Sequence, residues 1–318
     1  MKKFLKNIAI LLLIISLCCS VFSIFGFTVV GSQYKYNYQA SIIDKVNRLE
    51  SINEPKIILV GNSNLAFGID SEMIEEATGM PVVNLGLHGG LGNAFHEQIA
   101  KYNINKGDLV IVCHSSFSDT DNIGDASLAW ITIDNNIKFM KLLRIKDYPT
   151  MMKAYPNYFK KTLFFWVKHN GNWETDGCYS RSAFNKYGDI MVKPISEQID
   201  PDEFFSQPDN LVPDYKVSKK CVKRLNQYNE YIKSKGATLL VAGYPIAYGK
   251  YSPFTKDDFN NLNIELQNKL DCDVISDYTD YFYPYEYFYD SVFHLNREGT
   301  TVRTKQLIED INNWKSQH

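Results

Sequence analysis

Short apolar runs recur along this chain, and their alternation with amphipathic stretches constrains its fold more than any other feature. Five runs are suited to buried strands: residues 56–60, 81–85, 108–113, 237–242 and 273–276. Amphipathic stretches lie between several of them, at 71–77, 91–102, 217–235 and 257–270. Strand alternating with helix predicts an α/β domain with a parallel sheet of roughly five strands and helices on both of its faces.

The composition fits one large globular domain and identifies no charged partner. Of the 318 residues, 45% are hydrophobic and 22% are charged, so the chain can bury a large core without a second domain. The formal net charge is −2, and Lys and Arg are dispersed along the chain. These features argue against a nucleic-acid-binding protein.

The amino terminus differs from the rest of the chain. Lys2, Lys3 and Lys6 precede an apolar run that continues to Val30 with few polar interruptions. A helix needs roughly 20 apolar residues to cross the hydrocarbon core, and the lysines favour a cytoplasmic amino end. We therefore expect residues 1–30 to be a cell-membrane anchor and the remainder to be extracytoplasmic. A cleaved signal peptide is the alternative, although the run is longer than a usual signal core and no small-residue cleavage site ends it.

Two segments interrupt the pattern of strands and helices. Residues 31–55 are polar, with apolar residues at helical spacing, and we expect a stalk helix that leads into a domain over 56–318. Residues 115–214 carry many aromatics and no clear strand, and a structureless loop of this length is rare in a compact domain. We expect a mainly helical insertion placed after the third strand, over the carboxyl edge of the sheet.

A serine, a histidine and an aspartate lie at opposite ends of the predicted domain. Ser63 follows the first strand in a turn of small residues, and Asp290 precedes His294 by four positions, just before the last helix. A serine hydroxyl needs a neutral imidazole to accept its proton, and the imidazole needs a carboxylate to fix its tautomer. Because functional groups collect at the carboxyl ends of parallel strands, we expect the three side chains to meet there.

Each of these residues also has an ordinary structural role open to it. Ser63 is placed to cap the helix that follows it. Asp290 is likewise a potential helix cap, and His294 is a potential surface or core histidine. Their order along the chain, with Gly86 between them after the second strand, favours a common site over three separate roles.

Three short segments resemble sequence blocks of one enzyme superfamily. They read GNSN at 61–64, NLG at 84–86 and DSVFH at 290–294. These segments resemble the first, second and fifth blocks of the SGNH, or GDSL-type, hydrolases. With the amino-terminal anchor, the chain resembles the branch that includes the alginate acetylation proteins and the D-alanyl transfer protein of teichoic acid synthesis. The resemblance implies a flavodoxin-like, three-layer α/β/α fold, and it assigns the roles of nucleophile, base and orienting residue to Ser63, His294 and Asp290.

The resemblance also implies donors for an oxyanion. Two would be the backbone amides of Ser63 and Gly86, because a glycine lets the main chain approach without a side chain. The third donor of the family is an asparagine in a Gly-x-Asn-Asp block, and this chain has VCHSS at 112–116 instead. Loss of one such donor typically costs about a hundred- to a thousandfold in rate. His114 and Ser115 are the candidate replacements.

Three further residues are candidates for substrate contacts. Asn64 follows the predicted nucleophile, and His88 lies in a glycine-rich loop that we expect to border the cleft. Arg181 precedes a segment, 183–189, that resembles a loop of the same cell-surface proteins; by itself this segment predicts a turn built on Gly188.

No metal or other cofactor is expected. The glycines at 86–92 lack the order of a nucleotide-binding fingerprint and are typical of a tight turn between a strand and a helix. His88, His96 and His114 do not form a recognisable set of metal ligands.

Together these features predict an outward-facing, membrane-anchored serine esterase or O-acyltransferase that acts on acyl groups, acetyl above all, of a cell-envelope polysaccharide. Hydrolysis and transfer share an acyl-enzyme and differ in what attacks it second. The missing asparagine block leaves a second hypothesis open, a non-catalytic protein of the same fold that recruits polysaccharide or a membrane-bound acyltransferase. A lipase or thioesterase of this fold is a third, and it would need an apolar acyl channel.

Overall fold

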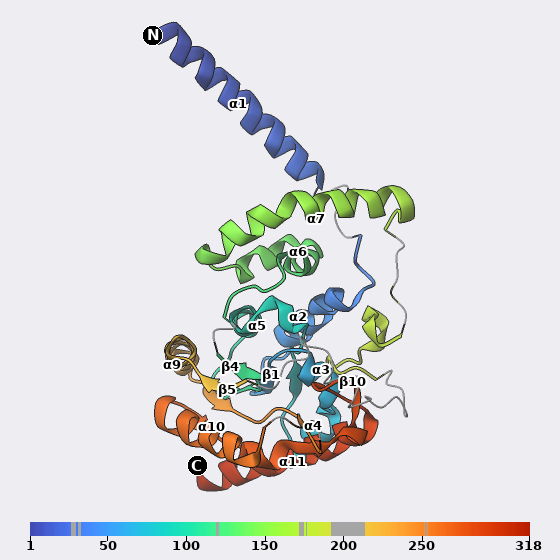
Figure 1. Cartoon of the computed structure of the whole chain (residues 1–318), viewed down its shortest axis with the longest axis vertical. Helices are drawn as coiled ribbons and strands as arrows, with labels where there is room; N and C mark the ends of the chain where they lie inside the picture. Colours follow the sequence, from blue (N-terminus) through green and yellow to red (C-terminus); the bar gives the residue numbers. More distant parts are fainter. Residues whose placement is uncertain are drawn as a thin grey trace.

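A five-stranded sheet lies at the centre of the domain, with strand order β2-β1-β3-β6-β8 (Figure 1). The computed structural model describes residues 1–26, 30, 33–118, 121–171, 175, 177–191, 214–250, 252 and 254–318. The strands are β1 (Ile57–Val60), β2 (Val82–Asn84), β3 (Leu109–Val112), β6 (Thr238–Val241) and β8 (Asp273–Val274). Every pairing among them is parallel. Each strand falls within one of the predicted apolar runs, so the predicted sheet is confirmed.

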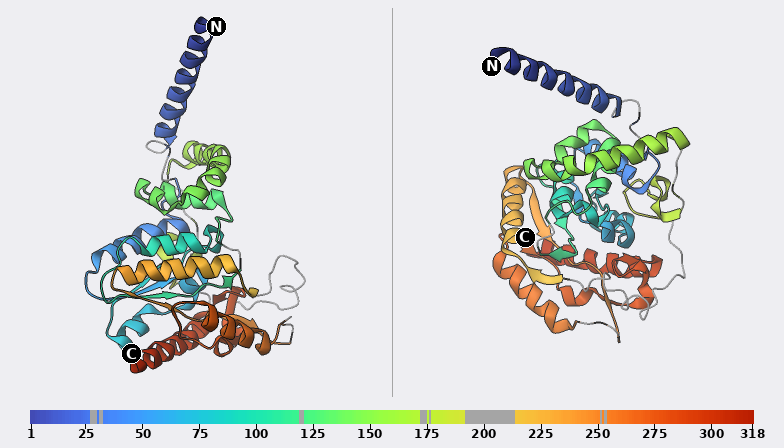
Figure 2. Two further views of the ribbon diagram at one scale, coloured as in Figure 1. Left: turned by 90° about the vertical axis from the view of Figure 1, so that its left-hand side faces the viewer. Right: turned by 45° about the horizontal axis from the view of Figure 1, so that its top comes forward.

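Side chains of the strands alternate between two hydrophobic cores, one on each face of the sheet. One core receives Ile58, Val60, Val110 and Val112 and packs against α2 (Ser41–Ser51), α5 (Asn93–Ala100), α9 (Lys219–Ser234) and α10 (Lys256–Lys269). The other receives Ile57, Leu59, Leu109 and Ile111 and packs against α4 (Ser71–Thr78) and α11 (Arg297–Gln317). Figure 2 shows these helices above and below the sheet. Because both faces of the sheet are covered at its centre, β1 and β3 are apolar and buried throughout, which made them visible in the sequence. The edge strand β8 is a short Asp-Val segment that is only partly buried.

Helix α2 belongs to the domain and is not a stalk outside it. Ile42, Val46 and Leu49 are fully buried in the core. Lys45 on the same helix donates from Nζ to the carbonyl oxygen of Asn84 at 2.9 Å. The expected helix is present, but its apolar residues pack in the core beside the sheet, so it is not a stalk that leads into the domain.

The described part of the insertion is mainly helical, as expected. Helices α6 (Ala126–Asp134) and α7 (Tyr148–His169) pack against each other beyond the layer of α2 and α5 (Figure 1). Two short strands at the ends of the insertion, β4 (Ser116–Phe117) and β5 (Asp214–Val217), pair in parallel. These two strands were not predicted, because such short strands leave no apolar run in the sequence. Residues 192–213 of the insertion lie outside the described residues.

The remaining elements are short, apart from one long terminal helix. They are α3 (Ser63–Gly68), β7 (Ile246–Tyr248), β9 (Phe282–Pro284), β10 (Phe288–Ser291), β11 (His294–Leu295) and the 3-10 turns η2 (Tyr38–Ala40), η3 (Gly89–Leu91), η4 (Ile137–Leu142), η5 (Ile145–Asp147), η6 (Gly177–Tyr179), η7 (Arg181–Ala183), η8 (Tyr278–Tyr281) and η9 (Tyr285–Tyr287). Helix α1 (Lys2–Phe25) extends away from the domain, and its segment Lys2–Phe22 is long and apolar enough to cross a membrane (Figure 1). Signal sequences meet the same criterion, so the anchor stays a prediction.

Candidate active site

Ser63 is the first residue of α3, which begins directly after β1. The residue before it, Asn62, caps the helix, because its Oδ1 accepts a hydrogen bond from the amide of Asn64 at 3.0 Å. With the cap supplied by Asn62, the hydroxyl of Ser63 is not needed for that purpose. The alternative role of Ser63 as a helix cap is therefore wrong.

Asp290 and His294 lie together in a β-hairpin. Strand β10 pairs antiparallel with β11, and Ser291 stands opposite His294. The hairpin brings the carboxylate and the imidazole together at a spacing of four residues without a helix. Helix α11 is capped by Asn296, whose Oδ1 accepts from the amide of Gly299 at 3.0 Å. The alternative role of Asp290 as a helix cap is therefore also wrong.

The structure brings the three side chains into one hydrogen-bonded series. His294 Nε2 lies 2.8 Å from Ser63 Oγ, and His294 Nδ1 lies 2.6 Å from Asp290 Oδ1. The ring of Phe67 stacks on the imidazole, with centroids 4.0 Å apart and planes inclined by 10°. These distances are within reach for proton transfer from the hydroxyl to the ring, and the order matches that of a Ser-His-Asp triad.

A tyrosine from the insertion completes the surroundings of Asp290. The hydroxyl of Tyr179 donates to Asp290 Oδ2, while Oδ1 faces His294. Burial alone would raise the pKa of Asp290, but the hydrogen bond and charge of His294, together with Tyr179, hold that pKa below its ordinary value. Asp290 is thereby kept ionised and oriented. No sequence pattern identified Tyr179 as a site residue, although Arg181 and the segment 183–189, which the sequence did indicate, lie only a few residues further on.

Two of the predicted oxyanion donors are used elsewhere in this structure. The amide of Gly86 donates to Oδ1 of Asn84 at 2.9 Å. His114 is fully buried, and its Nε2 lies 3.0 Å from Glu97 Oε1. A histidine at the end of a buried strand has no path to a substrate, and the carboxylate of Glu97 compensates its loss of water. The expectation that His114 replaces the missing asparagine is therefore wrong.

Ser115 and Asn62 are the polar side chains that meet beside Ser63. Asn62 Nδ2 donates to Ser115 Oγ at 2.6 Å, and both residues are half-buried. Ser115 follows β3, at the position where the resemblance to SGNH hydrolases implied an asparagine donor. The backbone amide of Ser63 lies in the first turn of α3, where helix amides have no partner within the helix. These groups are the candidate donors that remain. Asn62 was not predicted as a site residue, although its position beside Ser63 was a usable signal.

Of the three residues predicted to contact substrate, one borders the triad. His88 is exposed, and its pKa is lowered by partial burial and then by the charge of His294. Asn64 is fully buried, and its Nδ2 donates to the carbonyl oxygen of Cys113 at 3.0 Å. Arg181 forms an ion pair with Asp44 at 2.6 Å. Asn64 and Arg181 therefore have structural partners, and Asn64 cannot reach a substrate.

The segment that follows Arg181 fixes the end of β2. Asp189 is buried, and its Oδ1 accepts from Asn84 Nδ2 at 2.8 Å and from Ser71 Oγ at 2.7 Å. Gly188 has a φ of +99°, which a glycine adopts without strain, so the predicted turn on Gly188 is confirmed. Because Asn84 in turn accepts from the amide of Gly86, the segment positions the loop beside the nucleophile.

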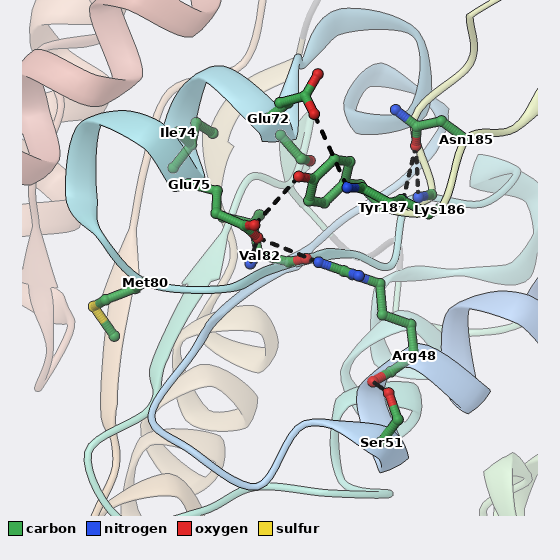
Figure 3. A network of polar contacts seen from close by, with 12 residues as sticks. Arg48, Ser51, Glu72, Ile74, Glu75, Met80, Val82, Asn185, Lys186 and Tyr187 are labelled. Atoms are coloured by element: carbon green, nitrogen blue, oxygen red, sulfur yellow. Dashed lines mark hydrogen bonds and ion pairs between the residues drawn. The ribbon is translucent and has the colours of Figure 1, made fainter.

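A second set of polar contacts ties the same segment to α4 and α2 (Figure 3). The hydroxyl of Tyr187 donates to Glu75 Oε1 at 3.2 Å. Glu75 Oε2 lies 3.3 Å from Arg48 Nη2, and Arg48 Nε donates to the carbonyl oxygen of Val82 at 2.8 Å. The guanidinium of Arg48 also lies over the ring of Tyr187, at 4.5 Å from its centroid. This segment of the insertion is thus an integral part of the domain.

The fold and the site together define an α/β protein with a hydrogen-bonded Ser-His-Asp arrangement at the carboxyl edge of a parallel sheet. Comparison of the chain with protein-family models finds no match, and comparisons with curated proteins and with solved structures find none either.

Proposed function

We propose that this protein is a membrane-anchored, extracytoplasmic serine enzyme of the SGNH type that hydrolyses or transfers O-acyl groups, acetyl above all, of a cell-envelope polysaccharide. One observation carries the proposal: His294 lies 2.8 Å from Ser63 Oγ through Nε2 and 2.6 Å from Asp290 through Nδ1. The strand order β2-β1-β3-β6-β8 supports the flavodoxin-like fold of that superfamily.

The arrangement suits acyl transfer in two steps. Ser63 Oγ attacks the ester carbonyl carbon while His294 Nε2 accepts its proton, and Asp290 stabilises the resulting imidazolium. The tetrahedral intermediate then expels the alcohol, which takes the proton from His294, and an acyl-enzyme remains. Water or a sugar hydroxyl then gives a proton to His294 and attacks the acyl carbon. His294 returns that proton to Ser63 Oγ as the bond between Oγ and the acyl carbon breaks. The first acceptor gives hydrolysis and the second gives transfer.

The location proposed for the enzyme follows from α1. A span over Lys2–Phe22 with lysines at its amino end favours a cytoplasmic amino terminus and an outward domain. This topology would hold the site beside growing envelope polymers.

Covalent labelling of Ser63 tests the proposal. We expect a fluorophosphonate to label the purified full chain at Ser63, and we expect Ser63→Ala and His294→Ala variants to lose both the labelling and the release of acetate from acetylated polysaccharide. Ser234→Ala, at an exposed serine at the end of α9, is the control and should be labelled like the parent. Full esterase and transferase activity in the Ser63→Ala variant would refute the proposal.

A second candidate function is favoured by the oxyanion side of the site. Gly86 donates its amide to Asn84, and His114 is buried against Glu97, so two expected donors are not directed at a substrate. A non-catalytic protein of this fold would recruit polysaccharide or a membrane-bound acyltransferase. In that case the full chain would bind acetylated polysaccharide, but the fluorophosphonate would not label Ser63. The Ser63→Ala variant would then bind the polysaccharide as well as the parent does.

A further inference from the structure

Helix α7 carries a strongly basic outer surface. Its 22 residues include four lysines and no acidic residue. The lysines are exposed, at Lys153, Lys160, Lys161 and Lys168. Large apolar side chains are exposed on the same helix: Met152 at 59%, Phe164 at 60% and Val167 at 75%. Cationic and apolar groups together are typical of helices that lie in the interface of a membrane.

The inner face of α7 is fixed to the domain, so the outer face has a defined direction. Met151, Tyr158 and Thr162 are buried. Met151 accepts at its carbonyl oxygen from Trp130 Nε1 at 2.8 Å, and the hydroxyl of Tyr158 donates to Asp134. A rotation of α7 that buried its exposed apolar residues would break these contacts.

The carboxyl end of α1 contacts α7 directly. The rings of Phe22 and Phe159 have centroids 5.0 Å apart, and the rings of Phe25 and Trp166 are 6.0 Å apart, edge to face. Figure 1 shows α7 running across the end of α1, between that helix and the rest of the domain. If α1 crosses a membrane, its end emerges at the level of the lipid headgroups. Helix α7 must then lie at that level too.

We propose that α7 lies in the surface of the membrane that α1 spans, with its exposed apolar residues at the acyl boundary and its lysines on anionic phospholipid headgroups. This inference rests on the anchor in the proposed function. Because α7 contacts the end of α1, the surface that its outer face meets is the lipid of the same membrane. The positive charges of its lysines complement anionic headgroups. Because α7 is fixed to the domain, this contact sets the orientation of the triad relative to the membrane.

Spin labels on the full chain in vesicles test the contact. Cys18, Cys19 and Cys272 are first replaced by alanine, and single cysteines are introduced as Met152→Cys, Val167→Cys, Leu13→Cys and Ile264→Cys. Ile264 on α10 is 56% exposed, a match for Met152, and α10 lies far from α1 (Figure 1). We expect labels at 152 and 167 to collide several-fold less with a water-soluble nickel complex, relative to oxygen, than the label at 264.

The label at position 13 separates the two proposals. If it is in lipid while labels at 152 and 167 behave like the label at 264, the anchor stands and the contact of α7 is refuted. If the label at position 13 is in water, the anchor fails and the inference about α7 fails with it.

Vesicles that differ in lipid charge test whether the lysines of α7 bind anionic headgroups. We expect the label at 152 to be better shielded in vesicles with anionic phospholipid than in neutral vesicles. Replacing Lys153, Lys160, Lys161 and Lys168 by glutamine should abolish that difference. The matched control replaces four exposed lysines of α9 and α10: Lys219, Lys223, Lys256 and Lys269. An equal loss in the control, or no effect of lipid charge on the parent, would overturn the role of the lysines.

Discussion

The carboxylate of Asp290 receives hydrogen bonds on both of its oxygens. His294 Nδ1 lies 2.6 Å from Oδ1, and the hydroxyl of Tyr179 donates to Oδ2. Two bonded oxygens fix the plane of the carboxylate, and the carboxylate in turn fixes which nitrogen of His294 carries the proton. Nε2 is then free to accept the proton of Ser63.

Replacement of Asp290 by asparagine tests this dependence. An amide can present its NH₂ to Nδ1 and thereby favour the tautomer with the proton on Nε2, which cannot act as base. We expect labelling and turnover of Asp290→Asn to fall about ten-thousandfold, as a wrong tautomer does in serine proteases, while the fold is retained. The rates of labelling and turnover measure the loss of catalysis, and circular dichroism measures retention of the fold. Asp257→Asn, at an exposed residue of α10, is the control. Parent-like rates in Asp290→Asn would show that the carboxylate does not orient the base.

Lys45 is a buried cation beneath the same region. Its Nζ donates to the carbonyl oxygens of Asn84 at 2.9 Å and Gly188 at 2.6 Å. Burial lowers the pKa of Lys45 from 10.5 to about 7, although the carboxylates of Asp189 and Asp44 act to raise it. The folded protein therefore binds its proton less tightly than the unfolded chain.

The lowered pKa of Lys45 makes the stability of the folded protein depend on pH. Between pH 7 and 10.5 the unfolded chain holds a proton on Lys45 that the folded protein has released, so the free energy of unfolding rises with pH. The largest slope is about 1.4 kcal/mol per pH unit for one group. We expect the stability of the parent, relative to Lys45→Met, to increase with pH over this window, as measured by denaturant titration of the detergent-solubilised chain. A difference that stays constant with pH would contradict the assignment.

At the scale of elements, the turn on Gly188 joins the insertion to β2. A Cβ at this position would lie 2.3 Å from the carbonyl oxygen of Asn84 and 2.8 Å from Lys45 Nζ. Gly79 ends α4 with a positive φ of 68°, and nothing lies within 4 Å of a Cβ built there. Both glycines thus have a positive φ, and they differ in their surroundings.

This pair gives a matched test of the turn. Gly79→Ala should cost about 1 to 2 kcal/mol of stability, the penalty for a left-handed residue with a side chain. Gly188→Ala should cost about 3 kcal/mol or more, because steric overlap with the backbone adds to that penalty. It should also slow labelling of Ser63, since Asn84 must move and Asn84 holds the loop at Gly86. Equal losses from both substitutions would show that the turn is not tightly packed.

The sequence predicted elements whose signal is local. Strands β1, β2, β3 and β6 were visible because their side chains are buried on both faces of the sheet, and Ser63 was visible because it follows β1. Tyr179 and the inward direction of His114 were not predictable, because their positions depend on packing between distant segments. Strands β10 and β11 were missed for a similar reason: two short, partly polar strands form a hairpin only when the domain supports it.

Across the whole molecule, the two halves of the site rest on parts of unequal stability. Ser63 follows β1, which is paired on one side with β2 and on the other with β3. Asp290 and His294 lie in a hairpin that forms a two-stranded sheet of its own. Strands in the centre of a sheet open only with the whole domain, whereas small peripheral sheets open locally. We therefore expect the base to separate from the nucleophile without global unfolding.

Hydrogen exchange of the full chain tests this difference. We expect amides of β1 and β3 to exchange slowest and amides of 288–295 to exchange at least about tenfold faster, the ratio that a difference of about 1.4 kcal/mol in opening free energy gives. A covalent adduct on Ser63 should slow the exchange of the hairpin amides and leave the exchange of the β1 amides unchanged. The reason is that an adduct in contact with His294 stabilises only the closed hairpin. If the hairpin of the free protein exchanges as slowly as β1, it opens only with the whole domain, and the base is held against Ser63 throughout the life of the folded protein.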